Sequence, residues 1–179
     1  MHQFIRRCFV VLAVLQCGVA GSAVAGELDL IVNGRSYHAD SDLDWNENNY
    51  GLGLEYQFDT SSRWIWSTNA NAFRDSLDNM SYMAGGGLRR RLFKSEHTAE
   101  FYLDVGLNAF LMSRADVNDH VPFPGVLPSL SLGMKQVGVN LAYLPAFASR
   151  MLVQSNVKNP DIGSVYFLQF RFHLVSTSN

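Results

Sequence analysis

The sequence predicts an all-β protein, an eight-stranded antiparallel transmembrane β-barrel of a bacterial outer membrane. Apolar and polar residues alternate along most of the chain, and turn signals divide this alternation into eight stretches. One face of these stretches is more uniformly apolar than the other. Alternation indicates strands because successive side chains point to opposite faces of a sheet. We therefore expect strands whose two faces meet different surroundings.

The first 25 residues predict a cleaved secretory signal. Two arginines precede an apolar run at residues 8–15, and the small residues that follow end in Ala23-Val24-Ala25. A short basic region, an apolar core too short to span a bilayer and an A-x-A site together are typical of such a signal. We expect the mature chain to begin at Gly26 and residues 26–179 to form a single domain.

The mature chain would contain no cysteine, because Cys8 and Cys17 both lie in the signal, so no disulfide framework can hold it. Cys17 could instead anchor a lipoprotein, but Gln16 stands where such signals carry a small residue. Without the signal the chain has 12 basic and 16 acidic residues, a net charge near −4. Arg89-Arg90-Arg91 is too short a basic run to indicate nucleic acid. No later segment approaches the roughly 18 to 20 apolar residues of a transmembrane helix.

The expected strands lie at about 28–39, 50–59, 64–75, 81–93, 99–113, 125–135, 137–145 and 163–174. The first begins almost at the expected cleavage site. In the second, alternate positions from 50 to 58 are Tyr, Leu or Phe, separated by Gly, Glu and Gln. In the fifth, every odd position from 101 to 111 is apolar. In the eighth, Tyr, Leu and Phe alternate with a mixed set from 166 to 174.

The connections between these strands alternate in length. Those near Thr60, Lys94 and Gln136 are tight, and they separate the second strand from the third, the fourth from the fifth and the sixth from the seventh. Longer connections lie at 40–49, 114–124 and 146–162, and the connection at 76–80 is shorter than these three.

The two faces of the strands distinguish a membrane barrel from a soluble one. A soluble barrel such as a lipocalin also alternates, but its polar residues lie outside. Here the more uniform face carries Leu, Tyr and Phe, whereas the other carries Asp, Asn, Gln, Glu and Gly. An apolar exterior with a mixed interior, long loops on one side and tight turns on the other favours an outer-membrane barrel. Closure also removes strand edges that lipid could not satisfy.

The strand count predicts which residues share one mouth of the barrel. With both termini in the periplasm, the connections after the first, third, fifth and seventh strands are extracellular. His38, Asp75, Ser76 and Arg114 each end one of these outward strands. A histidine beside a carboxylate and a hydroxyl can act as a general base. A polar residue at a barrel rim is by default a solvated loop residue, so residue types alone leave both interpretations open.

Prolines and glycines mark two irregular places in the predicted wall. Three prolines at 122, 124 and 128 lie close to the start of the sixth strand, and Pro145 ends the seventh. Proline cannot donate to a β-ladder, so we expect a local gap in hydrogen bonding there, either a lateral opening for a lipid chain or a loop that dips into the wall. Gly85-Gly86-Gly87 could leave interior space for a hydrocarbon chain, although barrel curvature explains such glycines equally well.

Four stretches of the mature chain resemble the PagP family of outer-membrane lipid A palmitoyltransferases, which are small eight-stranded barrels. They are Asp29-Leu30-Ile31 through Tyr37-His38-Ala39, Trp45-Asn46-Glu47 through Gly53-Leu54, Ala72-Phe73-Arg74-Asp75-Ser76, and Val121-Pro122-Phe123-Pro124-Gly125-Val126-Leu127-Pro128. They are similar to the family's W-H-A strand end, Y-N-E-x-x-x-G-x-G-x-G-L, A-F-K-D-S and I-P-L-P-V-L-L-P. The stretch from Val165 to Phe172 is also similar.

The resemblance implies transfer of a palmitoyl chain from a glycerophospholipid to lipid A in the outer leaflet, at an active site that faces the extracellular side. His38, Asp75 and Ser76 fall on the family's catalytic trio, with His38 as general base and the other two orienting it or the acceptor hydroxyl. Arg114 falls on a polar rim position. The resemblance places Gly87 at the floor of the acyl pocket, where glycine implies a sixteen-carbon chain. Pro128 and Pro145 match prolines that frame the family's lateral gap.

Two departures from the family pattern accompany the resemblance. The family's amphipathic helix before the first strand is missing, and the chain continues past Leu174 without the usual terminal aromatic. We expect a monomer that needs no metal or cofactor. Two other interpretations stay open: a lipid A deacylase or phospholipase on the same barrel plan, and a non-enzymatic structural barrel.

Overall fold

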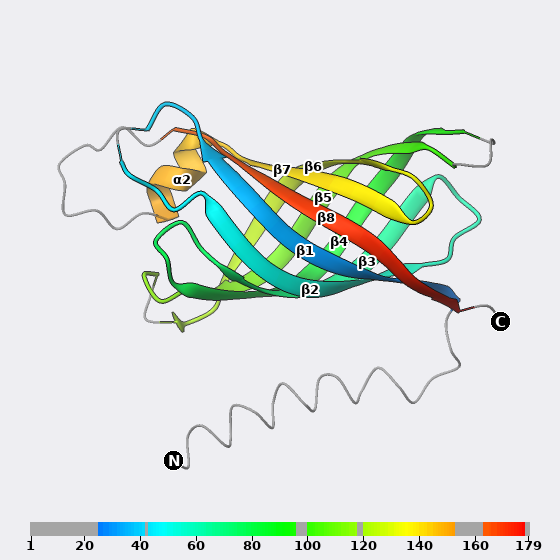
Figure 1. Cartoon of the computed structure of the whole chain (residues 1–179), viewed down its shortest axis with the longest axis horizontal. Coiled ribbons are helices and arrows are strands. Elements are labelled where there is room, and N and C mark those ends of the chain that lie inside the picture. Colours follow the sequence, from blue (N-terminus) through cyan, green and yellow to red (C-terminus); the bar gives the residue numbers. More distant parts are fainter. Residues whose placement is uncertain (1–24, 42, 96–99, 118–119, 153–162, 178–179) are drawn as a thin grey trace, which may run out of the picture.

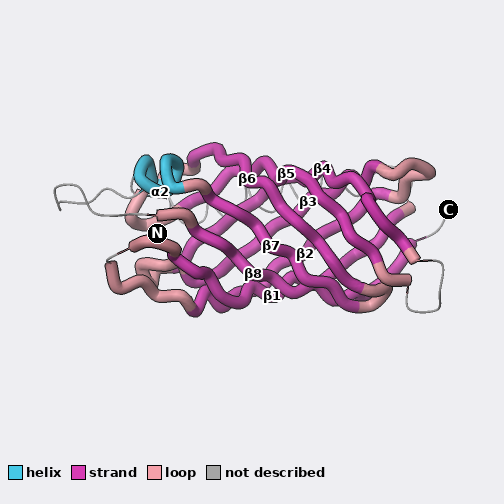
Figure 2. The backbone as a smooth tube through the Cα atoms, turned by 90° about the horizontal axis from the view of Figure 1, so that it is seen from above, coloured by secondary structure: helices cyan, strands magenta, loops and turns pink. Residues whose placement is uncertain are grey.

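The computed structural model describes residues 25–41, 43–95, 100–117, 120–152 and 163–177, so the predicted signal lies outside the described residues except for Ala25. Eight antiparallel strands form a closed barrel in which each strand pairs with its neighbours in the chain and the last pairs with the first (Figure 1). The predicted fold class is therefore confirmed. Figure 2 shows the same barrel as a closed tube of crossing strands, with one short helix at one end.

The predicted strands are all present, with ends that differ by a few residues. Their bounds are β1 (Gly26–His38), β2 (Asn48–Phe58), β3 (Trp64–Arg74), β4 (Met80–Lys94), β5 (Tyr102–Ser113), β6 (Phe123–Gly133), β7 (Val137–Leu144) and β8 (Val165–Thr177). β8 runs three residues past its expected end at 174 because β1 pairs with it as far as Thr177.

A helix that the alternation did not indicate, α2 (Ala146–Leu152), follows β7. The carbonyl oxygen of Pro145 accepts hydrogen bonds from the N–H groups of Ala148 and Ser149, at 2.9 and 3.1 Å, and so begins the helical turn. Ala, Arg, Met and Leu in this segment are good helix formers. Among the described residues, no helix is both long and apolar enough to cross a bilayer.

The polarity of the wall agrees with the prediction from alternation. Along β2, Tyr50 and Leu52 are 68% and 60% exposed on the outside, whereas Glu55 is buried in the lumen. Exposed aromatic rings gather toward both ends of the wall: Tyr37, Tyr50, Tyr82 and Tyr166 at one end, and Trp64, Trp66, Phe93 and Phe101 at the other. An apolar band between two aromatic girdles is the exterior of a barrel that spans an outer membrane.

The two ends of the barrel differ in their connections. Figure 1 shows α2 at the left, with the ends of β1, β3, β5 and β7 and the starts of β2, β4, β6 and β8; we call this the loop end. The tight connections after β2, β4 and β6 lie at the right with the barrel's two termini, which we call the turn end. The predicted grouping of the longer connections at one mouth is therefore present.

The wall is incomplete between β6 and β7. β6 pairs with β5 along its whole length, but only its last five residues, Ser129–Gly133, pair with β7. Residues 123–128 have no partner on β7, and we call this interval the β6–β7 gap. Two of its six residues, Pro124 and Pro128, cannot donate to a ladder. The predicted loss of hydrogen bonding at the prolines is thus confirmed, and it lies toward the loop end.

Candidate active site at the loop end

Asp75 directly follows β3 and shapes the turn that leads into β4. Its Oδ1 accepts hydrogen bonds from the N–H groups of Leu77 and Asn79, both at 3.0 Å, and its own N–H donates to the carbonyl of Asn79 at 2.8 Å. An aspartate that caps nearby backbone groups in this way stabilises a tight turn. The side chain is nonetheless only 2% exposed. The strand therefore stops where Asp75 turns inward.

The second carboxylate oxygen of Asp75 faces the barrel wall. Oδ2 accepts a hydrogen bond from the Ser81 hydroxyl at 2.8 Å and lies 3.5 Å from Nε of Arg114. Arg114, just past β5, also forms a bidentate pair with Asp116 at 3.0 and 2.8 Å. A paired guanidinium compensates for the burial of the Asp75 carboxylate. Asp75 and Arg114 thus join the turn after β3 to the end of β5.

His38 is the last residue of β1 and lies in the rim, beyond the girdle residue Tyr37. Its side chain is 7% exposed, and its ring stacks on Trp45 with centroids 4.8 Å apart and an interplanar angle of 11°. Burial lowers the pKa of His38 below the ordinary value of 6.5, and the positive charge of Arg114 lowers it further, while Glu47 opposes both. The imidazole is therefore mainly neutral near pH 7 and able to accept a proton.

The loop before β2 connects the His38 side of the rim to the Asp75 side. The N–H of Asn46 donates to the carbonyl of Ser76 at 3.0 Å, and its side-chain amide donates to the carbonyl of Asp75 at 3.3 Å. Its neighbours in the chain, Trp45 and Glu47, contact His38. Residue-level reasoning assigned no role to these three residues, although they stand together in the W-N-E stretch that carries part of the family resemblance.

The predicted trio is only partly assembled. Asp75, Ser76 and Arg114 line one cavity, but His38 is not among its lining residues. Within the described part of the chain, no hydrogen bond joins His38 to Asp75 or Ser76. Arg114 acts on both sides, because its Nε lies 3.5 Å from Asp75 and its charge lowers the pKa of His38. The groups share one mouth, and substrate would have to bridge them.

The cavity measures about 310 Å³ and occupies the loop half of the lumen. It begins at the polar rim, and its side wall includes residues 123–127 of β6, three residues of β7 and Ala148 and Met151 of α2. It therefore reaches the β6–β7 gap. Glu55 and Arg89 line it from below. A rim with charged groups, a mixed wall and a lateral gap suit a molecule with a polar head and an apolar chain.

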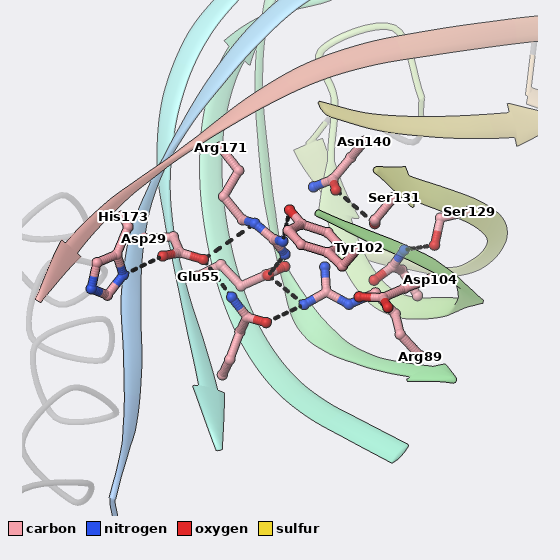
Figure 3. Close-up of polar contacts among 12 residues, drawn as sticks. Asp29, Glu55, Arg89, Tyr102, Asp104, Ser129, Ser131, Asn140, Arg171 and His173 are labelled. Carbon is pink, nitrogen blue, oxygen red and sulfur yellow. Dashed lines mark hydrogen bonds and ion pairs between the residues drawn. The ribbon is translucent and has the colours of Figure 1, made fainter. Parts of the chain in front are cut away.

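Below the cavity, buried ion pairs fill the lumen (Figure 3). Arg89 and Arg171 both contact Glu55 Oε1, at 2.9 and 3.0 Å, and Arg171 Nε lies 3.2 Å from Asp29. The hydroxyl of Tyr102 accepts a further hydrogen bond from Arg171. Each of these buried charges has opposite charges or polar groups around it, as buried charges require. This network closes the cavity toward the turn end.

Three other predicted residues lie near the cavity but are not among the residues that line it: Gly87, Pro128 and Pro145. A Cβ added to Gly87 would meet the side-chain oxygens of Asn108 and Ser67, at 2.6 and 2.7 Å. The interior space beside Gly87 is therefore occupied by these polar side chains, and Asn108 lines the cavity instead. Pro128 is the last residue of the β6–β7 gap, and Pro145 directly follows β7. Among the described residues, no group of three His, Cys, Asp or Glu side chains could hold a metal ion.

An apolar exterior, a polar rim and a cavity that reaches a gap in the wall define an integral β-barrel with a site accessible to lipid. Residues 26–171 match the family model described as "Antimicrobial peptide resistance and lipid A acylation protein PagP". The chain belongs to the PagP family, as its motifs indicated.

Relatives of known name support the same family. The "Lipid A acyltransferase PagP" of Bordetella pertussis is 32% identical over 127 residues, covering 67% of this chain and 68% of the relative. The protein of the same name from Erwinia pyrifoliae is 27% identical over 140 residues, covering 78% and 68%. Among solved structures, Neisserial surface protein A matches with a TM-score of 0.42 and 11% identity, covering 86% of this chain and 99% of its own. Ail of Yersinia pestis matches with a TM-score of 0.40 and 11% identity, covering 86% of this chain and 100% of its own.

Proposed function

We propose that this barrel moves a palmitoyl chain from a glycerophospholipid to lipid A in the outer leaflet, with its loop end facing the cell exterior. Membership of the PagP family makes the chain a lipid A acyltransferase. The observation that carries the finer proposal is the cavity that runs from the rim at Asp75, Ser76 and Arg114 to the β6–β7 gap.

His38 acts as the general base in this proposal. Its neutral imidazole accepts the proton of a lipid A hydroxyl while the hydroxyl oxygen attacks the ester carbonyl of the phospholipid. The tetrahedral intermediate collapses, the ester C–O bond of the donor breaks, and the imidazolium returns the proton to the departing lysophospholipid oxygen. No external reactant is needed, because one ester forms as another breaks.

The Asp75 side of the rim positions the reacting groups. Arg114 offers a positive charge for the oxygen that becomes negative in the tetrahedral intermediate. Asp75 holds the Arg114 guanidinium through its contact with Nε and is itself held by the turn. Ser76 lines the cavity, where its hydroxyl orients the acceptor. Asp75 therefore acts through Arg114 in this scheme, and Ser76 is the group that meets substrate.

The donor chain enters sideways from the membrane. The β6–β7 gap, framed by Pro128 and Pro145, opens the wall next to the cavity without breaking ladder bonds, since residues 123–128 have none to β7. Gly87 affects chain length through Asn108 and Ser67, whose side chains lie where a Cβ would project. A closed barrel with its own complete lumen needs no second copy, so we expect a monomer.

Mass spectrometry of lipid A tests this function. Cells in which phospholipid is present in the outer leaflet would express the wild type, His38→Ala or an empty vector, with equal amounts of folded barrel confirmed by heat-dependent migration on a gel. We expect lipid A to gain the mass of one palmitoyl group with the wild type alone. Lipid A identical in all three samples would exclude the transferase. Free fatty acid without hyperacylated lipid A would indicate a hydrolase instead.

A further inference from the structure

The imidazole of His38 is buried with one ring nitrogen unused. Its Nδ1 is buried and has no hydrogen-bond partner among the described residues. Stacking on Trp45 fixes the plane of the ring, and the indole Nε1 of Trp45 is itself held by a 2.7 Å hydrogen bond to the hydroxyl of Ser41. Buried polar atoms in folded proteins are normally paired. We therefore expect the group that faces Nδ1 to be its hydrogen-bond partner.

That group is the carboxylate of Glu47. Its Oε1 lies 4.0 Å from Nδ1 of His38 and accepts a hydrogen bond from the backbone N–H of the same residue at 3.3 Å. Its Oε2 contacts Arg35 at 3.3 Å, and its backbone carbonyl accepts the N–H of Ser36 at 2.9 Å. Glu47 is thus held against the end of β1 at three points. A small rotation of its side chain would complete a hydrogen bond to Nδ1.

The carboxylate of Asp75 already forms hydrogen bonds with groups other than His38. Its two oxygens accept three hydrogen bonds, from Leu77, Asn79 and Ser81, and face Arg114. It has no capacity left to orient the imidazole without dismantling the turn after β3. Among the described residues, Glu47 is the carboxylate placed beside Nδ1 of His38, whereas Asp75 and Asp116 both pair with Arg114.

We propose that Glu47 is the positioning residue for His38, holding a proton on Nδ1 and leaving Nε2 free to accept the proton of the acceptor hydroxyl. A carboxylate in this position sets the tautomer and orientation of a catalytic imidazole and stabilises the imidazolium that forms. The catalytic part of this inference rests on the proposed function, in which His38 is the base. The contact between Glu47 and His38 does not.

The charges around His38 give the sign of the expected pH effect. Arg114, from the end of β5, lowers the pKa of His38 and Glu47 raises it, in addition to the lowering by burial. Arg35 forms an ion pair with Glu47. Asp75 and Asp116 pair with Arg114. These three residues therefore affect the pKa of His38 through the charges of Glu47 and Arg114. Removing the charge of Glu47 leaves burial and Arg114 unopposed, so the pKa of His38 falls. The acid limb of the pH–rate profile then moves to lower pH, because the imidazole of His38 stays neutral down to a lower pH.

The pH profile of acyl transfer by the purified barrel in detergent tests the catalytic part. We expect Glu47→Gln to lower the rate at neutral pH about 10- to 100-fold, as the loss of an outer partner does for a metal-ligating histidine, and to move the acid limb of the pH–rate profile to lower pH. Glu47→Asp should restore part of the rate. Glu100→Gln is the matched control, since Glu100 pairs with Lys94 and Lys135 at the opposite end of the barrel. An unmoved acid limb in Glu47→Gln would overturn the proposal.

Nitrogen NMR of the folded barrel in micelles tests the contact without any substrate. The His38 signals are assigned by their loss in His38→Ala. We expect the neutral ring to carry its proton on Nδ1 in the wild type and to lose this preference in Glu47→Gln. A wild-type ring protonated on Nε2 would refute the positioning role even if His38→Ala abolishes acylation. Conversely, an Nδ1 proton that depends on Glu47 supports the contact even if no variant acylates lipid A, in which case only the proposed function fails.

Discussion

The loop half and the turn half of the lumen are built on opposite principles. The turn half is filled by ion pairs among Arg171, Glu55, Asp29 and Arg89, and its strands pair with their neighbours except at two bulges, Leu92 and Leu174. The loop half contains the cavity and the β6–β7 gap. The difference teaches that the buried ion pairs lie away from the cavity mouth. At the loop end, ladder hydrogen bonds are missing between β6 and β7, and this leaves the wall open beside the cavity.

The turn half is also fastened where the first and last strands meet. Leu28 pairs with Val175 but Asp29 with His173, so Leu174 is an extra residue in β8. This β-bulge brings His173 and Ser176, which are three residues apart, onto one face. The hydroxyl of Ser176 lies 3.1 Å from Nε2 of His173, and Nδ1 of His173 lies 3.1 Å from Asp29. Both residues lie beyond the part of the chain that matches the PagP model.

The largest expected effect is on activity alone, in the loop half. His38→Ala should lower the rate of acyl transfer in detergent about 10²- to 10⁴-fold, the usual contribution of a general base. The thermal unfolding midpoint should change little, because the ion pairs of the turn half are untouched. A variant that loses its fold together with its rate would contradict the separation of the two halves.

The next effect is on stability alone, in the turn half. Arg171→Ala leaves Glu55 and Asp29 with fewer partners in a buried site, which should lower the free energy of unfolding by about 3 to 5 kcal/mol. Denaturant titration of the refolded barrel measures this change. Arg90→Ala, which removes an exposed arginine beside Trp64, is the control, with an expected loss of about 1 kcal/mol or less. At temperatures where the Arg171 variant is folded, its transfer rate should match the wild type, and a large loss of rate there would place the network in the site.

Closing the gap should separate lipid access from chemistry. Pro128→Cys with Tyr143→Cys places a cysteine pair just beyond Ser129 and Ala142, the last paired residues of β6 and β7. The mature chain has no other cysteine. We expect the oxidised double variant to lose most of its transfer rate and to recover it on reduction, while each single variant is insensitive to the redox state. Full activity in the oxidised form would show that lipid enters elsewhere.

The smallest effect concerns the turn end of the pairing between β1 and β8. Ser176→Ala removes one exposed hydrogen bond to His173 and should lower the free energy of unfolding by about 0.5 to 1.5 kcal/mol. His173→Ala should cost more, because it also removes the contact with the buried carboxylate of Asp29. Denaturant titration compares the two variants, and equal losses would mean that the contact with Asp29 contributes nothing.

Alternation and turn signals were enough for the number of strands, the polarity of the two faces and the mouth at which His38, Asp75, Ser76 and Arg114 gather. These properties follow from the two-residue period of a strand and from the need of a membrane barrel to close. The prolines likewise indicated the β6–β7 gap, because the missing N–H is a property of the residue. The rim residues matched family motifs, but their roles remain proposals.

Only the tertiary structure decided which of these groups touch. The pairing of Asp75 with Arg114, the approach of Glu47 to His38 and the ion pairs of Arg171 depend on strand register and tilt, which bring together residues that no local pattern relates. The helix after Pro145 and the filled space beside Gly87 were missed for the same reason, since one depends on backbone geometry after β7 and the other on side chains from β3 and β5. The sequence by itself determined a lipid-facing barrel with a polar mouth. The tertiary structure decided which side chains at that mouth contact one another.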